Sequence, residues 1–132
     1  NMAEAIGEGI AQEGIPYKIF HAGLADRNDV VTEIFKTKAV IVGSPTFNQG
    51  ILPTLAPVLE DLRGLKFQNK IGAAFGTYGW SGESPQIIEE HLNKCNIPVL
   101  VESVKAKWQP KAEELEKCRE MGMKIAMAIK SG

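Results

Sequence analysis

Apolar runs alternate with helical patterns along the whole chain. Two runs, 39–42 and 71–75, are apolar on both faces, which is typical of strands inside a parallel sheet. Two more segments, 17–22 and 99–108, alternate apolar and polar residues and predict further strands, the first of them at an edge. This succession of strands and helices indicates βαβ units and therefore an α/β doubly wound fold with a parallel sheet.

Five segments carry apolar residues at helical spacing. We expect helices over 1–13, 26–35, 55–62, 84–95 and from about Pro110 to 129. Gly14 and Gly64 end the first and third of them, Asp26 caps the second, and Ser84 with Pro85 opens the fourth. In the last helix, one face is predicted to point into the core: Ala112, Leu115, Cys118, Met121, Ile125 and Ile129.

The predicted order begins with a helix, whereas a doubly wound domain begins with a strand. The apolar stripe of the first helix starts at Met2, with only Asn1 in front of it as a cap. We therefore interpret residues 1–132 as one domain whose first strand is absent from this chain.

Two glycine-rich loops follow the two most apolar strands, Gly43 to Gly50 and Gly76 to Glu83. In an open α/β sheet, ligands bind beyond the carboxyl ends of the strands, where both loops are expected. Glycines let the main chain approach a flat ligand closely, and Tyr78 and Trp80 offer rings that stack on it. The loops therefore favour a planar, polar-edged heterocycle over a metal or a sugar.

The sequences of these two loops resemble those of a known family. Val42-Gly43-Ser44-Pro45-Thr46-Phe47-Asn48 and Phe75-Gly76-Thr77-Tyr78-Gly79-Trp80-Ser81-Gly82-Glu83 closely resemble the flavodoxin-like domain of flavodiiron proteins (A-type flavoproteins). The resemblance covers essentially the whole chain. It implies a five-stranded sheet in the order 2-1-3-4-5, with strand 1 absent here, that binds one FMN.

In the family, the loops after the third and fourth strands hold the isoalloxazine ring. Carried onto this chain, the contacts on one side of the flavin are Ser44, Pro45, Thr46, Phe47 and Asn48. Those on the other side are Thr77, Tyr78, Gly79, Trp80 and Gly82. The loop that binds the FMN phosphate in the family comes between the first strand and first helix, so it is expected to lie before Asn1.

The resemblance also implies a role and partners. Electrons pass from rubredoxin or another reductant through FMN to a di-iron domain that reduces O2 or NO, in a parent oxidoreductase that can be a homo-oligomer. The domain itself would be an electron-transfer module without catalytic residues. His21 and His91 lie far apart without a metal-binding motif, so the chain itself is predicted to hold no metal.

Composition removes several classes of function. Lys and Arg number 15 against 16 Asp and Glu, so no basic field favours nucleic acid. No apolar run approaches the ~20 residues of a membrane span, and no signal-peptide pattern opens the chain. Cys95 and Cys118 lack a Cys-x-x-Cys spacing and fall on apolar helix faces, which indicates core thiols and a reducing cytoplasm. Trp108 is interpreted as a core or interface residue.

Three other functions stay open at this point. An FMN-dependent NAD(P)H reductase or a free-standing flavodoxin would share the fold and the cofactor. The first lacks a Gly-x-Gly-x-x-Gly fingerprint here, and the second is usually more acidic. A flavin-free receiver-like domain would need acidic residues at the ends of the first and third strands, where Ser44-Pro45-Thr46 supplies none.

Overall fold

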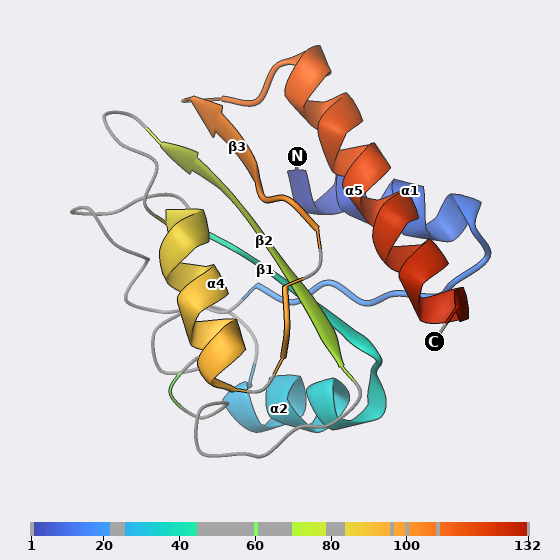
Figure 1. Ribbon diagram of the computed structural model, residues 1–132, viewed down its shortest axis with the longest axis vertical. Helices are drawn as coiled ribbons and strands as arrows, with labels where there is room; N and C mark the ends of the chain where they lie inside the picture. The colour runs from blue at the N-terminus through green and yellow to red at the C-terminus, as the bar shows by residue number, and fades with distance from the viewer. Residues whose placement is uncertain are drawn as a thin grey trace.

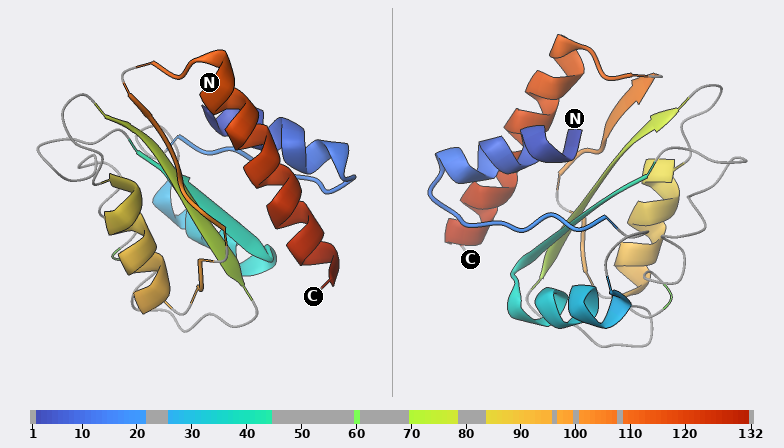
Figure 2. Two further views of the ribbon diagram at one scale, coloured as in Figure 1. Left: turned by 45° about the horizontal axis from the view of Figure 1, so that its top comes forward. Right: turned by 180° about the vertical axis from the view of Figure 1, so that it is seen from behind.

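The computed structural model describes residues 2–21, 26–44, 60, 70–78, 84–95, 97–99, 101–107 and 109–131. Within them, three strands form one parallel sheet in the order β1-β2-β3, with helices on both faces (Figures 1 and 2). The strands are β1 (Ala39–Gly43), β2 (Ile71–Tyr78) and β3 (Val104–Lys107). The predicted α/β doubly wound fold is confirmed.

The sheet is staggered about its central strand. β1 pairs with the first part of β2, from Ala39 opposite Ile71 to Gly43 opposite Phe75. β3 pairs with the last part, from Val104 opposite Phe75 to Lys107 opposite Tyr78. Phe75 is therefore paired with both neighbours. The later part of β2 extends beyond the end of β1.

The helices α1 (Met2–Gln12) and α5 (Ala112–Ser131) cover one face of the sheet, as Figure 2 shows. The core of this layer is formed by Met2, Ala5, Ile6, Ile10, Ala73, Val104, Ala106, Cys118, Met121, Ile125 and Ala126. The two helices touch at glycines. A Cβ on Gly122 would lie 2.1 Å from the Ile6 carbonyl oxygen, and one on Gly9 would lie 2.0 Å from that of Arg119. Only glycine allows this backbone contact.

The helices α2 (Arg27–Lys36) and α4 (Ser84–Lys94) cover the other face. The core of this layer is formed by Ile34, Val40, Ala74, Ile88, Leu92, Cys95 and Ile97. The carboxylate of Asp26 caps α2 by accepting from the Asn28 N–H at 2.8 Å. At the other end of α2, the buried Lys70 ammonium donates to the carbonyl oxygens of Phe35 and Thr37.

Most predicted elements are confirmed, with changes at their ends. Gly14 ends α1 with a positive φ of 78°, which is a glycine conformation. Cys95 and Cys118 are buried free thiols, as expected. The prediction for Ala112 is wrong: it is exposed, because α5 begins there and its first turn projects past the sheet. The predicted helix 55–62 lies outside the described residues, apart from Glu60, which is helical.

The predicted edge strand at 17–22 is not formed over residues 17–21, and Ala22 lies outside the described residues. A strand needs a partner along its edge, and no described strand lies beside this segment. Its apolar side chains remain 40–44% exposed at Tyr17, Ile19 and Phe20. For the same reason β1 is only half-buried apart from Val40, although its sequence predicts burial on both faces.

Two further predicted boundaries differ from those in the structure. Gly76, Thr77 and Tyr78 are predicted to begin a loop, but they extend β2 because β3 supplies hydrogen-bond partners there. The predicted strand at 99–108 is split into a single bridge between Gly72 and Val99 and, after an interruption, β3. In β3 the predicted alternation is confirmed: Val104 and Ala106 are buried, and the lysines between them are exposed.

Candidate functional site

β1 and β2 run parallel towards the same edge of the sheet, where β1 ends opposite Phe75 and β2 continues to Tyr78 (Figure 1). Ser44 follows β1 directly and is only 4% exposed. Its N–H donates to the carbonyl oxygen of Phe75 at 3.2 Å, which fixes the end of β1 against β2. The first glycine-rich loop therefore leaves the sheet from a fixed point beside β2.

The end of β1 is closely packed. A Cβ on Gly43 would lie 2.1 Å from Cζ of the Phe75 ring, so the ring occupies the space of a side chain at this position. The neighbouring Gly76 is buried as well. This edge therefore combines small residues with one aromatic ring.

Three of the ten predicted flavin contacts fall on described residues. Ser44 is buried at the end of β1, Thr77 is half-buried in β2, and Tyr78 ends β2. The other seven lie outside the described residues: Pro45, Thr46, Phe47, Asn48, Gly79, Trp80 and Gly82. The structure thus brings the starts of both predicted loops to one edge.

The chemistry of this edge fits a planar heterocycle. Ser44 and Thr77 bring hydroxyl groups, Gly43 and Gly76 bring a bare main chain, and no carboxylate follows β1 at Ser44. Among the described residues, no group of three or more His, Cys, Asp or Glu side chains is placed to hold a metal ion.

The histidines and cysteines lie elsewhere. His21 is exposed, and His91 lies in the last turn of α4, far from the helix start that follows the second loop. Its Nδ1 is buried without a hydrogen-bond partner among the described residues. Burial raises the pKa of the Cys118 thiol to about 11, which makes it a poor nucleophile. Of these four residues, Cys95 and Cys118 belong to the cores on the two faces of the sheet.

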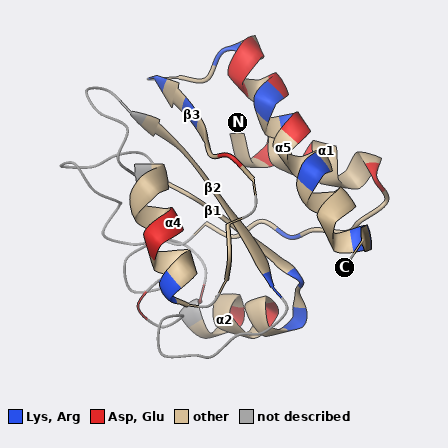
Figure 3. Ribbon diagram, in the orientation of Figure 1, with Lys and Arg blue, Asp and Glu red and all other residues tan. Residues whose placement is uncertain are grey.

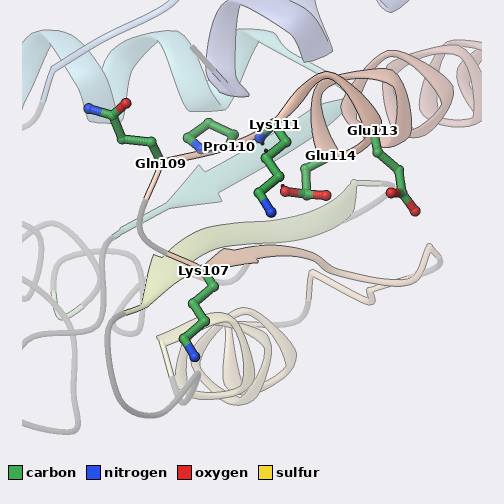
Figure 4. Close-up of a pocket in the computed structure, with 6 residues that line it drawn as sticks. All are labelled: Lys107, Gln109, Pro110, Lys111, Glu113 and Glu114. Carbon is green, nitrogen blue, oxygen red and sulfur yellow. Dashed lines mark hydrogen bonds between the residues drawn. The ribbon is translucent and has the colours of Figure 1, made fainter.

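A hollow of about 630 Å³ lies beside this edge, between the end of β3 and the start of α5 (Figure 4). It is lined by Lys107, Gln109, Pro110, Lys111, Glu113 and Glu114. The Glu114 carboxylate accepts from the Lys111 N–H at 3.1 Å, which caps the first turn of α5. Sequence reasoning did not connect Lys107 with the site, because its place opposite Tyr78 depends on the register of β3.

In the described part of the chain, no helix has the length and apolar character needed to cross a membrane. Basic and acidic residues are interspersed along α5 (Figure 3).

Comparisons with known proteins agree on one family. The flavodoxin family profile matches residues 1–122. A nitric oxide reductase of Moorella thermoacetica is 45% identical over 97% of this chain, which spans 32% of that protein. An anaerobic nitric oxide reductase flavorubredoxin of Aeromonas hydrophila is 39% identical over 95% of this chain, which spans 26% of that protein. The chain therefore covers about a third or less of these curated relatives.

Similar solved structures come from the same family. A rubredoxin oxygen:oxidoreductase from Desulfovibrio gigas has a TM-score of 0.95 and 39% identity over 98% of this chain and 32% of its own. A flavodiiron protein from Giardia intestinalis has a TM-score of 0.89 and 27% identity, with coverage of 98% and 32%. A flavodoxin from the domain Archaea has a TM-score of 0.87 and 32% identity over 98% of this chain and 88% of its own. The chain belongs to the flavodoxin family and is a flavodoxin-like domain of the kind found in flavodiiron proteins.

Proposed function

We propose that this domain binds one FMN at the carboxyl edge of β1 and β2 and serves as the electron-transfer domain of a flavodiiron oxidoreductase. The observation that carries the proposal is that the residues which begin the two predicted loops lie at the same edge of the sheet. Gly43 lies opposite Phe75, and Ser44 donates to the Phe75 carbonyl oxygen, three residues before β2 ends at Tyr78.

In this proposal, residues from the two loops enclose the flavin ring. Ser44, Pro45, Thr46, Phe47 and Asn48 contact it from one side, and Thr77, Tyr78, Gly79, Trp80 and Gly82 from the other. The cofactor supplies the redox chemistry, accepting and donating electrons when bound. The chain's own residues bind the ring, orient it and exclude water from it.

The wider setting follows the relatives. The names of the similar proteins include nitric oxide reductase and rubredoxin oxygen:oxidoreductase, so we propose a rubredoxin-like donor and a di-iron acceptor that reduces NO or O2 in the parent protein. A homo-oligomeric parent is part of the same proposal. The two free cysteines agree with a reducing compartment, and we propose the cytoplasm.

Cofactor selectivity tests the proposal directly. The full-length protein is freed of flavin and titrated with FMN, FAD and riboflavin, with binding followed by quenching of flavin fluorescence. We expect FMN to bind most tightly, because the flavodoxin family binds this flavin. Preferential binding of FAD, or the absence of a flavin spectrum after reconstitution, contradicts the proposal. Rapid bleaching of the flavin by NAD(P)H alone would indicate an NAD(P)H reductase instead.

The two tryptophans give a matched test of the site residues. Trp80 belongs to the second loop, whereas Trp108 follows β3 in the chain. Loss of one ring stack costs ~1 kcal/mol, so Trp80→Ala is expected to raise the Kd for FMN about fivefold. Trp108→Ala is the control and should leave the Kd close to that of the parent chain. Equal dissociation constants for both variants would show that Trp80 does not contact the ring.

A further inference from the structure

The four methionines of the chain differ sharply in their exposure to solvent. Met2 and Met121 are 4% and 3% exposed and belong to the core that α1 and α5 form against the sheet. Met123 is half-buried, and Met127 is 56% exposed. Met123 and Met127 lie four positions apart on α5, so their side chains are neighbours on one face of this helix. We call Met123 and Met127 the methionine pair.

The geometry of α5 places the methionine pair away from the core. At 3.6 residues per turn, Met123 lies roughly 200° around the helix axis from Met121. Met121 is packed in the core, so Met123 and Met127 lie on the outer side of α5. The helix positions that border the pair on this side are exposed and charged: Glu120, Lys124 and Lys130. The pair is therefore apolar within a charged part of the surface.

A docking patch for another protein is the simplest alternative explanation of an exposed methionine. Such a patch needs a large, continuous apolar surface. The other large apolar side chains that are exposed among the described residues lie outside α5: Tyr17, Ile19, Phe20 and Phe35. Two methionines bordered by charged side chains do not form a continuous apolar surface, so the pair is open to water and to small solutes.

The chemistry of an exposed thioether is oxidation by a hydroperoxide. One peroxide oxygen forms a bond to sulfur as the O–O bond breaks, and the other oxygen keeps the proton and leaves as an alcohol, or as water from hydrogen peroxide. The sulfur loses two electrons, and the hydroperoxide gains them. The product is methionine sulfoxide, which methionine sulfoxide reductases convert back to methionine.

The position of a methionine decides what this oxidation costs the domain. A sulfoxide on Met127 would be hydrated, because the side chain lies in solvent. On Met121, the same polar oxygen would be buried in the core beside Gly122, where α5 touches the backbone of α1 at Ile6. A buried polar group without a hydrogen-bond partner destabilises a fold. The domain should therefore tolerate oxidation at the methionine pair and not in the core.

We propose that the methionine pair is a site of reversible oxidation by hydroperoxides. Met127 is oxidised first and Met123 second, while Met121 stays reduced as long as the domain is folded. Each sulfur consumes one hydroperoxide, and reduction of the sulfoxide restores the site. This inference is independent of the proposed flavin site, because the pair belongs to the outer side of α5 and needs no cofactor.

The test measures the oxidation rate of each methionine by peptide mass spectrometry after addition of hydrogen peroxide. The full-length protein is used without a reductant, so that added peroxide is the only oxidant and any part of the protein that covers α5 is present. The same reaction in urea gives the rate of each methionine in the unfolded chain. We expect Met127 to react within about threefold of its unfolded rate, whereas Met121 should react at least about a hundredfold more slowly than in urea, since it needs an opening of the core.

Two variants of equal chemistry give the matched comparison. Met127→Leu and Met121→Leu each remove one sulfur and keep a similar apolar volume, so both should fold. Met127→Leu should abolish the fastest phase of oxygen uptake, and Met121→Leu should leave it unchanged. The protein oxidised at Met127 alone should still unfold cooperatively, and treatment with the two sulfoxide reductases, one for each epimer, should return its original mass.

The results separate the possible roles of the pair. Fast oxidation of Met127 that is lost only in Met127→Leu and is reversed by the reductases supports the proposal. A Met127 that is as slow as Met121 in the folded full-length protein overturns it, because another part of the protein then covers this side of α5. Equal rates at all four methionines, or a sulfoxide at Met127 that the reductases cannot reach, overturn it as well.

Discussion

The helices on the two faces of the sheet are fixed in different ways. On one face, α1 and α5 touch backbone to backbone at Gly9 and Gly122, and Arg119 joins them through an ion pair with Glu8 at 2.8 Å. On the other face, α4 is attached to the sheet by large buried side chains such as Ile88 and Leu92. On the first face, α1 and α5 thus pack as one unit through their backbones. On the other face, side chains attach the helices to the strands.

This difference predicts opposite tolerances to mutation. A contact between two backbones leaves no room for an added methyl group, because a neighbouring carbonyl cannot rotate away. A contact made by side chains tolerates the loss or exchange of atoms, and the loss of stability grows with the volume of the cavity that is left. The α1–α5 layer should therefore be sensitive to added volume, and the α2–α4 layer to removed volume.

The largest effect is expected for Gly122→Ala. Helix propensity alone would make alanine stabilising by ~1 kcal/mol, but its Cβ would lie 2.1 Å from the Ile6 carbonyl oxygen. We expect a loss of about 4 kcal/mol in the free energy of unfolding, measured by urea denaturation, because α1 and α5 must move apart. Gly7→Ala is the control, since the three atoms nearest its Cβ all belong to the half-exposed Tyr17 side chain, which can swing away. Similar losses for both variants would refute the backbone contact.

The second effect belongs to the other layer. Leu92 is fully buried in α4, so Leu92→Ala removes packed volume and should cost about 3 kcal/mol in the free energy of unfolding. Met127→Ala removes a side chain that is 56% exposed and should change stability by less than about 0.5 kcal/mol. If both substitutions cost the same, α4 is not attached to the sheet through Leu92.

A smaller effect should appear at alkaline pH in the α1–α5 layer. Burial raises the pKa of Cys118 to about 11 from an ordinary value of 9.0. The folded protein therefore keeps the thiol neutral while the unfolded chain ionises it. Stability from this group is complete below pH 9 and is lost as the pH rises towards 11, by on the order of 2 kcal/mol. Comparison with Cys118→Ala isolates the contribution, since the other titrating groups are shared. An identical pH dependence in both proteins contradicts the assignment.

The smallest effect is expected for the ion pair that joins the helices. Arg119 and Glu8 are both partly exposed, so Arg119→Ala should cost only about 0.5 kcal/mol in the free energy of unfolding. The double-mutant cycle with Glu8→Ala, followed by thermal unfolding at low and at high salt, measures the coupling. A coupling above about 2 kcal/mol would show that charge, rather than the glycine contact, holds α1 to α5.

Sequence reasoning succeeded where a signal is local. Asp26 was assigned as a helix cap and Gly14 as a helix end from residue type alone, and both are confirmed. It also placed Val104 and Ala106 on one face of a strand, because period-two alternation needs no knowledge of the neighbours. The family and its fold followed from the loop residues.

The remaining features depend on partners that a sequence does not specify. β2 extends through Tyr78 because β3 lies beside it. The strand expected at residues 17–22 is not formed over 17–21, because no described strand lies beside that segment. The contact between Gly9 and Gly122 joins residues from opposite ends of the chain. Most of the predicted flavin contacts lie outside the described residues and stay predictions.

The stagger of the sheet has a consequence for how the domain opens. Beyond Phe75, β2 is paired with β3 alone, and successive amides of a strand point to opposite sides, as the Ile71 N–H donates to Lys38 and the Gly72 N–H to Pro98. Detachment of β3 would therefore release the amides of Gly76 and Tyr78, which lie on the same side as that of Gly72, while the pairing with β1 stays closed. This fluctuation at the end of β2 is thus separable from unfolding of the domain, and a ligand held there would be seen first as slower amide exchange at these two residues.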